Sequence, residues 1–474
     1  MKAKCAQALR RLALPTGALL LAGCTAFSPD GGFAPVQQAA RDRLGKELVL
    51  ARSEADLDTI DKRVAELLAQ PLSADAAVQI ALLNNRGLQA SFQQLGLTEA
   101  EVVQSGRLPN PAFVFGRKTR GDEVELEYFL AFNIARLIAL PLINEVEARR
   151  FEQVKGATVL AMLGLAADTR KAWIAAVAAD ESVRYMRQVL EAAEASAELA
   201  RRMAAVGNFN ALQRAREQSF QADAALNVAR AVNAQRATRE RLTRLMGLWG
   251  QQAKFTLPER LPALPDEPTD QPNIERTAMA KRLDVQGAKL AAEQTAKNLN
   301  LTKTTRFVNL LELGLSRKTF NEGPSERGWE IAIELPIFDW GDARIAQAEA
   351  IYMQSLHRAA ETAVNARSEV REAYGGYRAA YEIARQYRDQ IVPLRQQIAE
   401  QNLLRYNGML IGVFELLADA RVQITSVNSA IEALRDFWIA QADLEMAMVG
   451  KPGAPIAIAG AAAPAAAADG GPGH

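Results

Sequence analysis

A strand that passes directly into a long helix occurs twice in this sequence. In residues 329–350, apolar and polar residues first alternate with a period of two, which predicts a strand with one apolar and one polar face. A proline then removes a backbone donor, and an Ala-rich helical pattern follows. Residues 140–149 repeat the hinge of residues 335–344 at an offset of 195 positions. The chain therefore contains one structural unit twice, with predicted strand–helix hinges at Pro141, Pro336 and Gly341.

The duplication also sets the predicted domain boundaries. Residues 73–250 form the first repeat and residues 274–450 the second, and each contains short helices, two strands and a long helical hairpin. Residues 251–273 carry five prolines, which excludes a helix and predicts an extended linker. Residues 451–474 are rich in Ala, Gly and Pro, a composition that predicts a disordered tail. The fold class is mainly α with a small β part.

The four predicted strands are residues 112–117, 124–132, 307–317 and 328–338. The alternation is clearest in residues 123–132, and it fits either a half-exposed soluble strand or a membrane strand with a lipid face and a lumen face. Four strands cannot close a membrane barrel, because the smallest barrels have about eight. Open edges in lipid leave backbone groups unpaired at several kcal/mol each. If the strands insert, the chain must oligomerise, and three copies would supply twelve strands.

The N-terminus has the features of a lipoprotein signal. Residues 1–23 combine a basic start with an apolar stretch that is too short to span a bilayer. The stretch ends in Leu-Ala-Gly before Cys24, which resembles a bacterial lipobox. Acylation of Cys24 would make residues 24–72 an N-terminal anchor segment, and Thr25 in place of Asp matches lipoproteins that are sorted to the outer membrane. An ordinary signal peptide with an incidental cysteine is the alternative.

Composition argues against several other classes of protein. The formal charge is +1 without basic runs, which argues against a nucleic-acid partner. Two histidines and two cysteines provide neither a His-rich metal site nor a disulfide framework. The sequence shows no constellation of nucleophile, base or metal ligands, so we expect no enzyme activity. The covalent lipid on Cys24 is the one expected prosthetic group.

The repeated strands, the hinge Leu-Pro-Ile-Phe-Asp-Trp-Gly at residues 335–341, the long hairpins and the proline-rich linker together resemble the TolC-type outer-membrane factors of Gram-negative tripartite efflux pumps. The resemblance covers about residues 73–450, although the first hinge has Asn-Glu-Val at residues 144–146 in place of the Asp/Gly turn. It implies a homotrimer with a twelve-stranded barrel in the outer membrane and a helical barrel in the periplasm. It also implies a periplasmic membrane-fusion adaptor and an inner-membrane pump as partners.

The resemblance also assigns expected roles to individual residues. The hairpin tips would dock the adaptor through Val206, Gly207, Asn208, Gly408, Ile411, Gly412 and Val413. The periplasmic aperture would be narrowed by a ring of three Asp419 copies and locked by Arg405 or Arg421 of a neighbouring copy. If the apolar strand faces contact lipid, the barrel lumen would carry Glu123, Glu125, Glu127, Glu312, Glu330 and Glu334, which favour cations.

The sequence therefore predicts a passive exit duct for small solutes such as drugs or metal ions. Two other functions remain open. A periplasmic coiled-coil adaptor or structural lipoprotein would explain the hairpins, but an adaptor is not expected to duplicate the complete unit. A duct for protein secretion would share the fold, although the lipobox favours small-solute pumps by resemblance.

Overall fold

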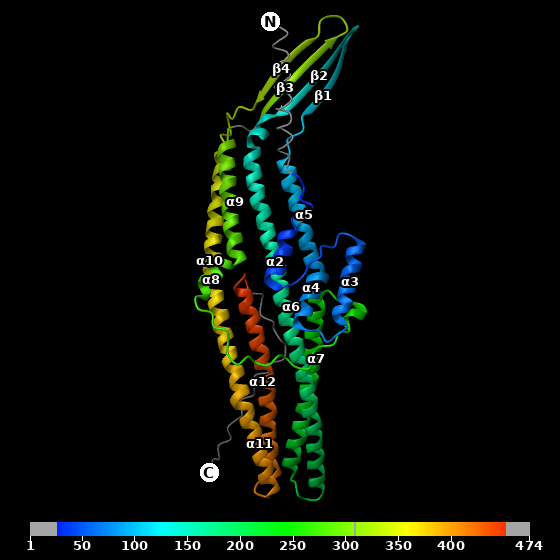
Figure 1. Ribbon diagram of the computed structural model, residues 1–474, viewed down its shortest axis with the longest axis vertical. Coiled ribbons are helices and arrows are strands. Elements are labelled where there is room, and N and C mark those ends of the chain that lie inside the picture. Colours follow the sequence, from blue (N-terminus) through cyan, green and yellow to red (C-terminus); the bar gives the residue numbers. More distant parts are fainter. Residues whose placement is uncertain (1–25, 308–309, 452–474) are drawn as a thin grey trace. The chain divides into compact units, whose positions relative to one another are not determined.

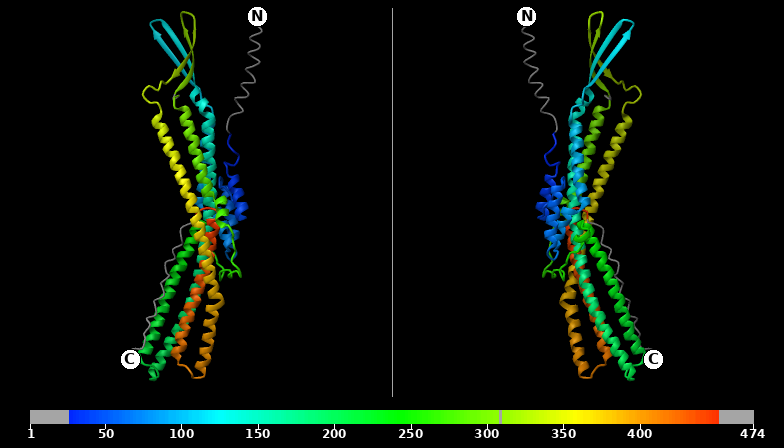
Figure 2. Two further views of the ribbon diagram at one scale, coloured as in Figure 1. Left: turned by 90° about the vertical axis from the view of Figure 1, so that its left-hand side faces the viewer. Right: turned by 90° about the vertical axis from the view of Figure 1, so that its right-hand side faces the viewer.

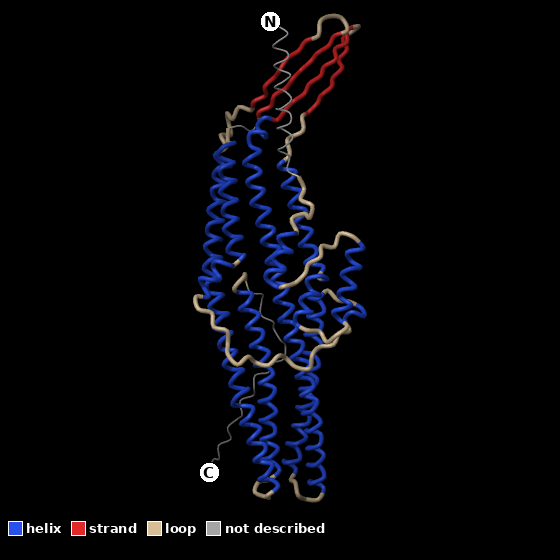
Figure 3. The backbone as a smooth tube through the Cα atoms, viewed as in Figure 1, coloured by secondary structure: helices blue, strands red, loops and turns tan. Residues whose placement is uncertain are grey.

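The structure is a computed structural model in which residues 26–307 and 310–451 are described. The signal peptide, Cys24 and all but the first residue of the predicted tail lie outside the described residues. The described chain is mainly helical with one small sheet, as predicted (Figure 3). A search of the described residues finds no helix whose length and hydropathy would let it cross a bilayer.

The chain divides into two compact units. The first contains residues 1–39, 90–159 and 283–365, and the second contains residues 40–89, 160–282 and 366–474. These units do not coincide with the sequence repeats, because each repeat contributes segments to both.

The first unit contains a four-stranded antiparallel sheet in the order β1-β2-β3-β4 (Figure 1). The strands are β1 Ala112–Arg120, β2 Glu123–Asn133, β3 Leu311–Phe320 and β4 Glu326–Ile333. The pairing of β2 with β3 joins the two repeats, and the two hairpins remain side by side in both side views (Figure 2). All four predicted strands are confirmed, but β4 ends at Ile333, five residues before the predicted end.

The strand–helix hinges differ between the repeats. Helix α6, Ile134–Ala205, starts directly after β2, and Asn133 caps it by accepting a hydrogen bond from the Arg136 backbone at 2.8 Å. Pro141 lies inside α6, so its predicted role as a hinge is wrong. The capping asparagine ends the extended backbone eight residues earlier, and the helix tolerates the proline at the loss of one backbone hydrogen bond.

The second hinge lies where the sequence predicts it. Pro336 and Gly341 occupy the loop between β4 and α10, which spans Asp342–Gln386. Gly341 has φ +74°, and a Cβ there would lie 3.1 Å from the Arg306 carbonyl oxygen. The left-handed backbone and the close approach both require glycine at this turn.

The helices of the first unit include α5, Arg86–Gly106, and α9, Leu283–Thr305, which lie against the first part of α6. Ion pairs join them, with Lys297 2.7 Å from Glu145 and Arg150 2.9 Å from Glu101. The N-terminal segment adds α2, Ala34–Leu44, which the sequence did not predict. Phe33, just before α2, packs edge-on against Phe92 of α5 at 5.0 Å between ring centroids.

The second unit contains two long helical hairpins and the short helices around them (Figures 1 and 2). The first hairpin is the end of α6 with α7, Ala211–Met246, and the second is α10–α11, ending at Asn407, with α12, Val413–Ala447. The short helices are α3 Glu54–Leu68, α4 Ala74–Asn84 and α8 Ile274–Lys281. One core lies around Trp173 and Leu242, and a second lies around Tyr381 and Phe437.

The two repeats share one feature at the base of their hairpins. In each, the end of a short helix has the same backbone conformation, and a side chain there bonds a carbonyl at the end of the hairpin's second helix. Asn85 ends α4 with φ −67° and ψ 114°, and Arg282 ends α8 with φ −66° and ψ 123°. In the first repeat, Asn84 donates to the Gly247 carbonyl just beyond α7 at 2.8 Å. In the second, Arg282 donates to the Ala447 carbonyl at the end of α12 at 3.1 Å. The backbone thus repeats the unit that the sequence pattern predicts, with different polar side chains at the joint.

A π-helical turn, Tyr387–Ile391, separates α10 from α11, Val392–Asn407. Pro393 follows this turn, and it has no N–H to donate to the preceding turn. A wider i→i+5 turn accommodates that missing donor, so the proline explains the irregularity.

Candidate functional site

The sheet has one polar and one apolar face. The strand register brings five predicted lumen carboxylates to the same face. These are Glu123, Glu125, Glu127, Glu312 and Glu330. Glu334 lies one residue beyond β4, although its backbone N–H still bonds the Leu310 carbonyl at 3.2 Å. The shared face agrees with the alternation in the sequence.

Basic residues that the sequence analysis missed lie on this polar face. Lys118 is 3.0 Å from Glu127, and Lys318 lies between Glu125 and Glu127 at 3.5 and 3.6 Å. The two-residue turn between Arg120 and Glu123 sets the register of β1 against β2. Because this turn can be read from the sequence, it could have been used to predict that lysine and glutamate side chains meet on this face. The face is therefore a mixed set of charges in which carboxylates outnumber bases.

The opposite face of the sheet is exposed, and it is apolar except toward the strand turns, where the register also places Arg117, Arg317 and Arg327. Phe113 is 65% exposed, Trp329 69% and Ile331 52%, although all three are large hydrophobic residues. Tyr128 lies on the same face, 5.3 Å from the ring of Phe115. A contiguous exposed apolar surface of this kind marks a place of contact with a lipid or protein partner.

The tip of the first hairpin is a tight turn at Val206, Gly207 and Asn208. Gly207 has φ +81°, a conformation that favours glycine, and Val206 is 72% exposed. Asn210 starts α7 with a capping box in which Asn210 and Gln213 bond one another's backbone at 2.8 Å. The cap fixes the turn and leaves Val206 exposed at the tip.

The tip of the second hairpin differs from the predicted set of docking residues. Gly408 has φ −80°, and Met409 takes the left-handed conformation with φ 57°. Met409 and Leu410 are exposed at the tip, and both were missed by the sequence analysis. Ile411 is only 8% exposed, because the turn folds its side chain inward, so it is not available for docking. Gly412 precedes α12 and is exposed, and Val413 at the start of α12 is half-buried.

Within one chain, Asp419, Arg405 and Arg421 do not contact one another, and the lock between neighbouring copies stays a prediction. Asp419 accepts a hydrogen bond from the buried side chain of Asn402. Arg405 is exposed on α11. Arg421 instead pairs with Glu217 of α7 at 2.7 Å, which joins the two hairpins within one chain.

The Arg421–Glu217 pair is built into a partly buried network. Glu217 is 2% exposed and accepts a second hydrogen bond from Ser196 of α6 at 2.7 Å. The guanidinium of Arg421 lies over the ring of Phe220, 4.4 Å from its centroid. A charge-assisted hydrogen bond of this kind is stronger than a neutral one. Glu217 was missed because it is one of many charged residues in α7, and no sequence spacing links it to Arg421.

Glu198 gives the last turns of α6 a pH dependence. Arg201 and Arg202 bond its carboxylate at 2.7 Å and lower its pKa from an ordinary 4.5 to about 2. The interaction stabilises the folded turn above pH 4.5, and this contribution is lost as the pH falls from 4.5 towards 2. We expect amide exchange of residues 199–206, corrected for the intrinsic rate, to accelerate over this range. The Glu198→Gln variant should show no such change, and equal behaviour of both proteins would contradict the assignment.

Comparison with known proteins identifies relatives of this fold. No protein-family model matches the chain. The cobalt-zinc-cadmium resistance protein CzcC of Cupriavidus metallidurans is 26% identical over 296 residues. The match covers 59% of this chain and 66% of CzcC, just under two thirds of its length.

Solved structures with the same fold include two membrane proteins. The outer membrane channel CmeC of Campylobacter jejuni superimposes with a TM-score of 0.67 at 16% identity, over 85% of this chain and 89% of CmeC. A membrane protein from Pseudomonas aeruginosa gives a TM-score of 0.68 at 19% identity, over 79% of this chain and 93% of that protein. The chain therefore has the fold of the outer-membrane channels, which confirms at the level of the fold its predicted resemblance to the TolC-type outer-membrane factors.

Proposed function

We propose that this chain is the exit duct of a tripartite efflux system in the Gram-negative outer membrane. The two-faced sheet is the observation that carries the proposal. Its apolar face is exposed, its polar face carries an excess of carboxylates, and its outer strands β1 and β4 pair with no other strand of the described chain. A soluble protein would have to cover the apolar face and blunt both edges.

Closure of the sheet requires an oligomer, and the resemblance to the outer-membrane factors supports three copies. Lipid-exposed strand edges are excluded because no water satisfies their backbone groups. One chain supplies four strands, and a membrane barrel needs about eight or more. A homotrimer in which β4 of each copy pairs with β1 of the next gives a closed barrel of twelve strands. The apolar face then contacts lipid, and the polar face surrounds a water-filled lumen.

Transport through this lumen is passive. The excess carboxylates of the polar face, repeated in three copies, create a negative potential that favours cations. Energy and selection come from the pump, so the chain needs neither a tight binding site nor a catalytic group. Small solutes are the proposed cargo, and the name of the CzcC relative makes divalent metal ions the first cargo to test.

The hairpin tips are proposed to dock the periplasmic adaptor, which joins the duct to the inner-membrane pump. Val206, Met409 and Leu410 offer exposed apolar side chains there. The Arg421–Glu217 pair ties the two hairpins together near these tips, and docking would shift them apart. Acylated Cys24, outside the described residues, would anchor each copy to the membrane.

Conductance across a planar bilayer tests the duct directly. Purified protein should form long-lived, water-filled channels with a preference for K⁺ over Cl⁻. Replacement of Glu123, Glu125 and Glu330 by glutamine should reduce this preference and leave the oligomer intact. Absence of conductance from a correctly folded, membrane-inserted oligomer would contradict the proposal.

Arg421→Ala tests the link between the hairpins. The variant loses a charge-assisted hydrogen bond that contributes about 1.5–3 kcal/mol. We expect the tips to separate more often, so that single-channel conductance rises and openings last longer. Arg405→Ala, which removes an exposed arginine from α11, should leave conductance close to that of the parent protein. If Arg405→Ala raised the conductance more than Arg421→Ala, the closed state would instead be held by an ion pair between Arg405 and Asp419.

A further inference from the structure

Two cavities lie along α6 and α12 in the second unit. Their volumes are about 570 and 760 Å³, each within the size range of ligand pockets. Both cavities are lined by Arg170, Ala442 and Glu445, so they adjoin at these residues. We call this surface the α6–α12 groove. Trp173 and Trp438 line one end, and Leu163 and Met448 line the other.

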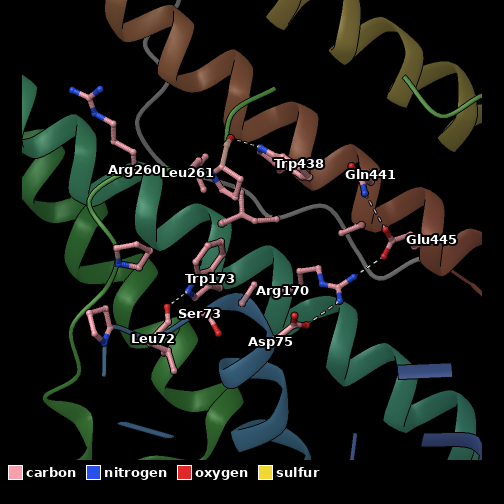
Figure 4. Close-up of a pocket in the computed structure, with 16 residues that line it drawn as sticks. Leu72, Ser73, Asp75, Arg170, Trp173, Arg260, Leu261, Trp438, Gln441 and Glu445 are labelled. Atoms are coloured by element: carbon pink, nitrogen blue, oxygen red, sulfur yellow. Dashed lines mark hydrogen bonds and ion pairs between the residues drawn. The ribbon is translucent and has the colours of Figure 1, made fainter. Parts of the chain in front are cut away.

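The polar groups at the tryptophan end of the groove already have partners. Trp173 donates to the Leu72 carbonyl at 2.7 Å, and Trp438 donates to the Pro262 carbonyl at 3.0 Å. Arg170 lies between Glu445 and Asp75 at 2.6 and 3.8 Å, as Figure 4 shows. With its donors and charges paired in this way, the tryptophan end of the groove selects an uncharged, apolar occupant rather than a polar ligand.

The described chain ends beside this groove. Helix α12 closes with the backbone N–H groups of Val449 and Gly450 bonded to the Met446 carbonyl at 2.9 and 2.8 Å. A Cβ on Gly450 would lie 2.3 Å from a methyl carbon of Leu160, so the chain crosses α6 in close contact. Leu160 lies one helical turn from Leu163 on the same face of α6. The residues after position 451 therefore start at the wall of the groove.

The sequence beyond this point has the chemistry that the groove selects. Residues 452–468 contain no charged side chain, and Ile456 and Ile458 are the large apolar residues among them. The two ends of the groove, Val449 and Trp438 of α12, are about 16 Å apart at 1.5 Å of rise per residue. An extended chain covers this distance in about five residues. Ile456 and Ile458 can therefore reach both tryptophans.

We propose that residues 452–458 of the same chain occupy the α6–α12 groove, with Ile456 and Ile458 against Trp173 and Trp438. The segment would fasten α12 of the second repeat to α6 of the first. It would also cover an apolar surface that is otherwise open to solvent.

Thiol labelling of a single groove residue tests this inference. The Gln441→Cys variant places a thiol in the wall of the groove, and maleimide labelling at residue 441 is followed by peptide mass spectrometry, so native cysteines do not contribute. We expect slow labelling in the full chain and labelling at least about tenfold faster after truncation behind Lys451, a factor that corresponds to about 1.4 kcal/mol of protection. A Thr425→Cys variant, exposed on α12 outside the groove, should react equally in both backgrounds.

Matched charge substitutions separate docking of the segment from a general effect of truncation. Ile456→Lys with Ile458→Lys should accelerate labelling as truncation does, because charged side chains do not fit the apolar groove. Ala466→Lys with Ala468→Lys adds the same charge beyond the proposed contact and should leave labelling slow. Fast labelling in every variant would overturn the inference. Slow labelling in every variant, including the truncated chain, would also overturn it and would indicate that a second copy covers the groove.

Discussion

Leu315→Arg should prevent stable assembly of the duct. Leu315 lies in the middle of β3 on the apolar face, beside Leu130 of β2 and Trp329 of β4, and it is 50% exposed. In the proposed barrel it contacts lipid near the midplane, where an arginine costs about 2–4 kcal/mol per copy. Three copies carry the substitution in every assembly. We expect little folded oligomer in outer-membrane fractions and a lower thermal midpoint for what is recovered.

Ser316→Arg is the matched control, because the neighbouring residue points to the opposite face of the same strand. There the arginine would lie in the polar lumen, and assembly should remain close to that of the parent protein. Equal yields of the two variants would show that the faces are not divided between lipid and water. A defect in Ser316→Arg alone would reverse the assignment of the faces.

Arg282→Met should destabilise the second unit by about 3–5 kcal/mol, the range for breaking a buried ion pair. Arg282 is 1% exposed and lies 2.6 Å from Glu369 of α10, and it also bonds the Ala447 carbonyl at 3.1 Å. Its loss leaves the Glu369 carboxylate without its guanidinium partner at the joint of α8, α10 and α12. Denaturant unfolding at fixed protein concentration measures the change, since the stability of an oligomer depends on concentration.

Two controls isolate the buried pair. Arg276→Met removes an exposed arginine from the same helix and should change the free energy of unfolding by no more than about 0.5 kcal/mol. Arg282→Met combined with Glu369→Met removes both charges and should recover much of the lost stability. A double variant as unstable as the single one would show that the backbone hydrogen bonds of Arg282, not its charge, hold the joint.

Much of the fold could be predicted because the sequence repeats itself. The strand–hinge–helix pattern occurs twice, so each copy strengthens the prediction of the other. The alternation of polar and apolar residues then assigns each strand residue to a face. The first hinge was misplaced because the similarity of residues 140–149 to the second hinge suggested a turn at Pro141. The local capping by Asn133 ends the strand earlier, and a long helix can tolerate one proline.

The site was less predictable than the fold. The lumen carboxylates can be assigned to one face because polar and apolar residues alternate along each strand, and this alternation is visible within a short stretch of sequence. The pair between Arg421 and Glu217 joins residues 204 positions apart, and many charged residues in these helices would fit equally well in sequence. At the second tip, the glycine appeared to be the turning residue, but Met409 takes the left-handed conformation instead.

The native mass of the membrane-extracted protein tests the central claim most directly. The protein is extracted from outer membranes in mild detergent, and its mass is measured with the bound detergent subtracted. We expect three chains per particle and no extraction without detergent. A monomer or dimer that stays soluble without detergent would contradict the twelve-stranded barrel.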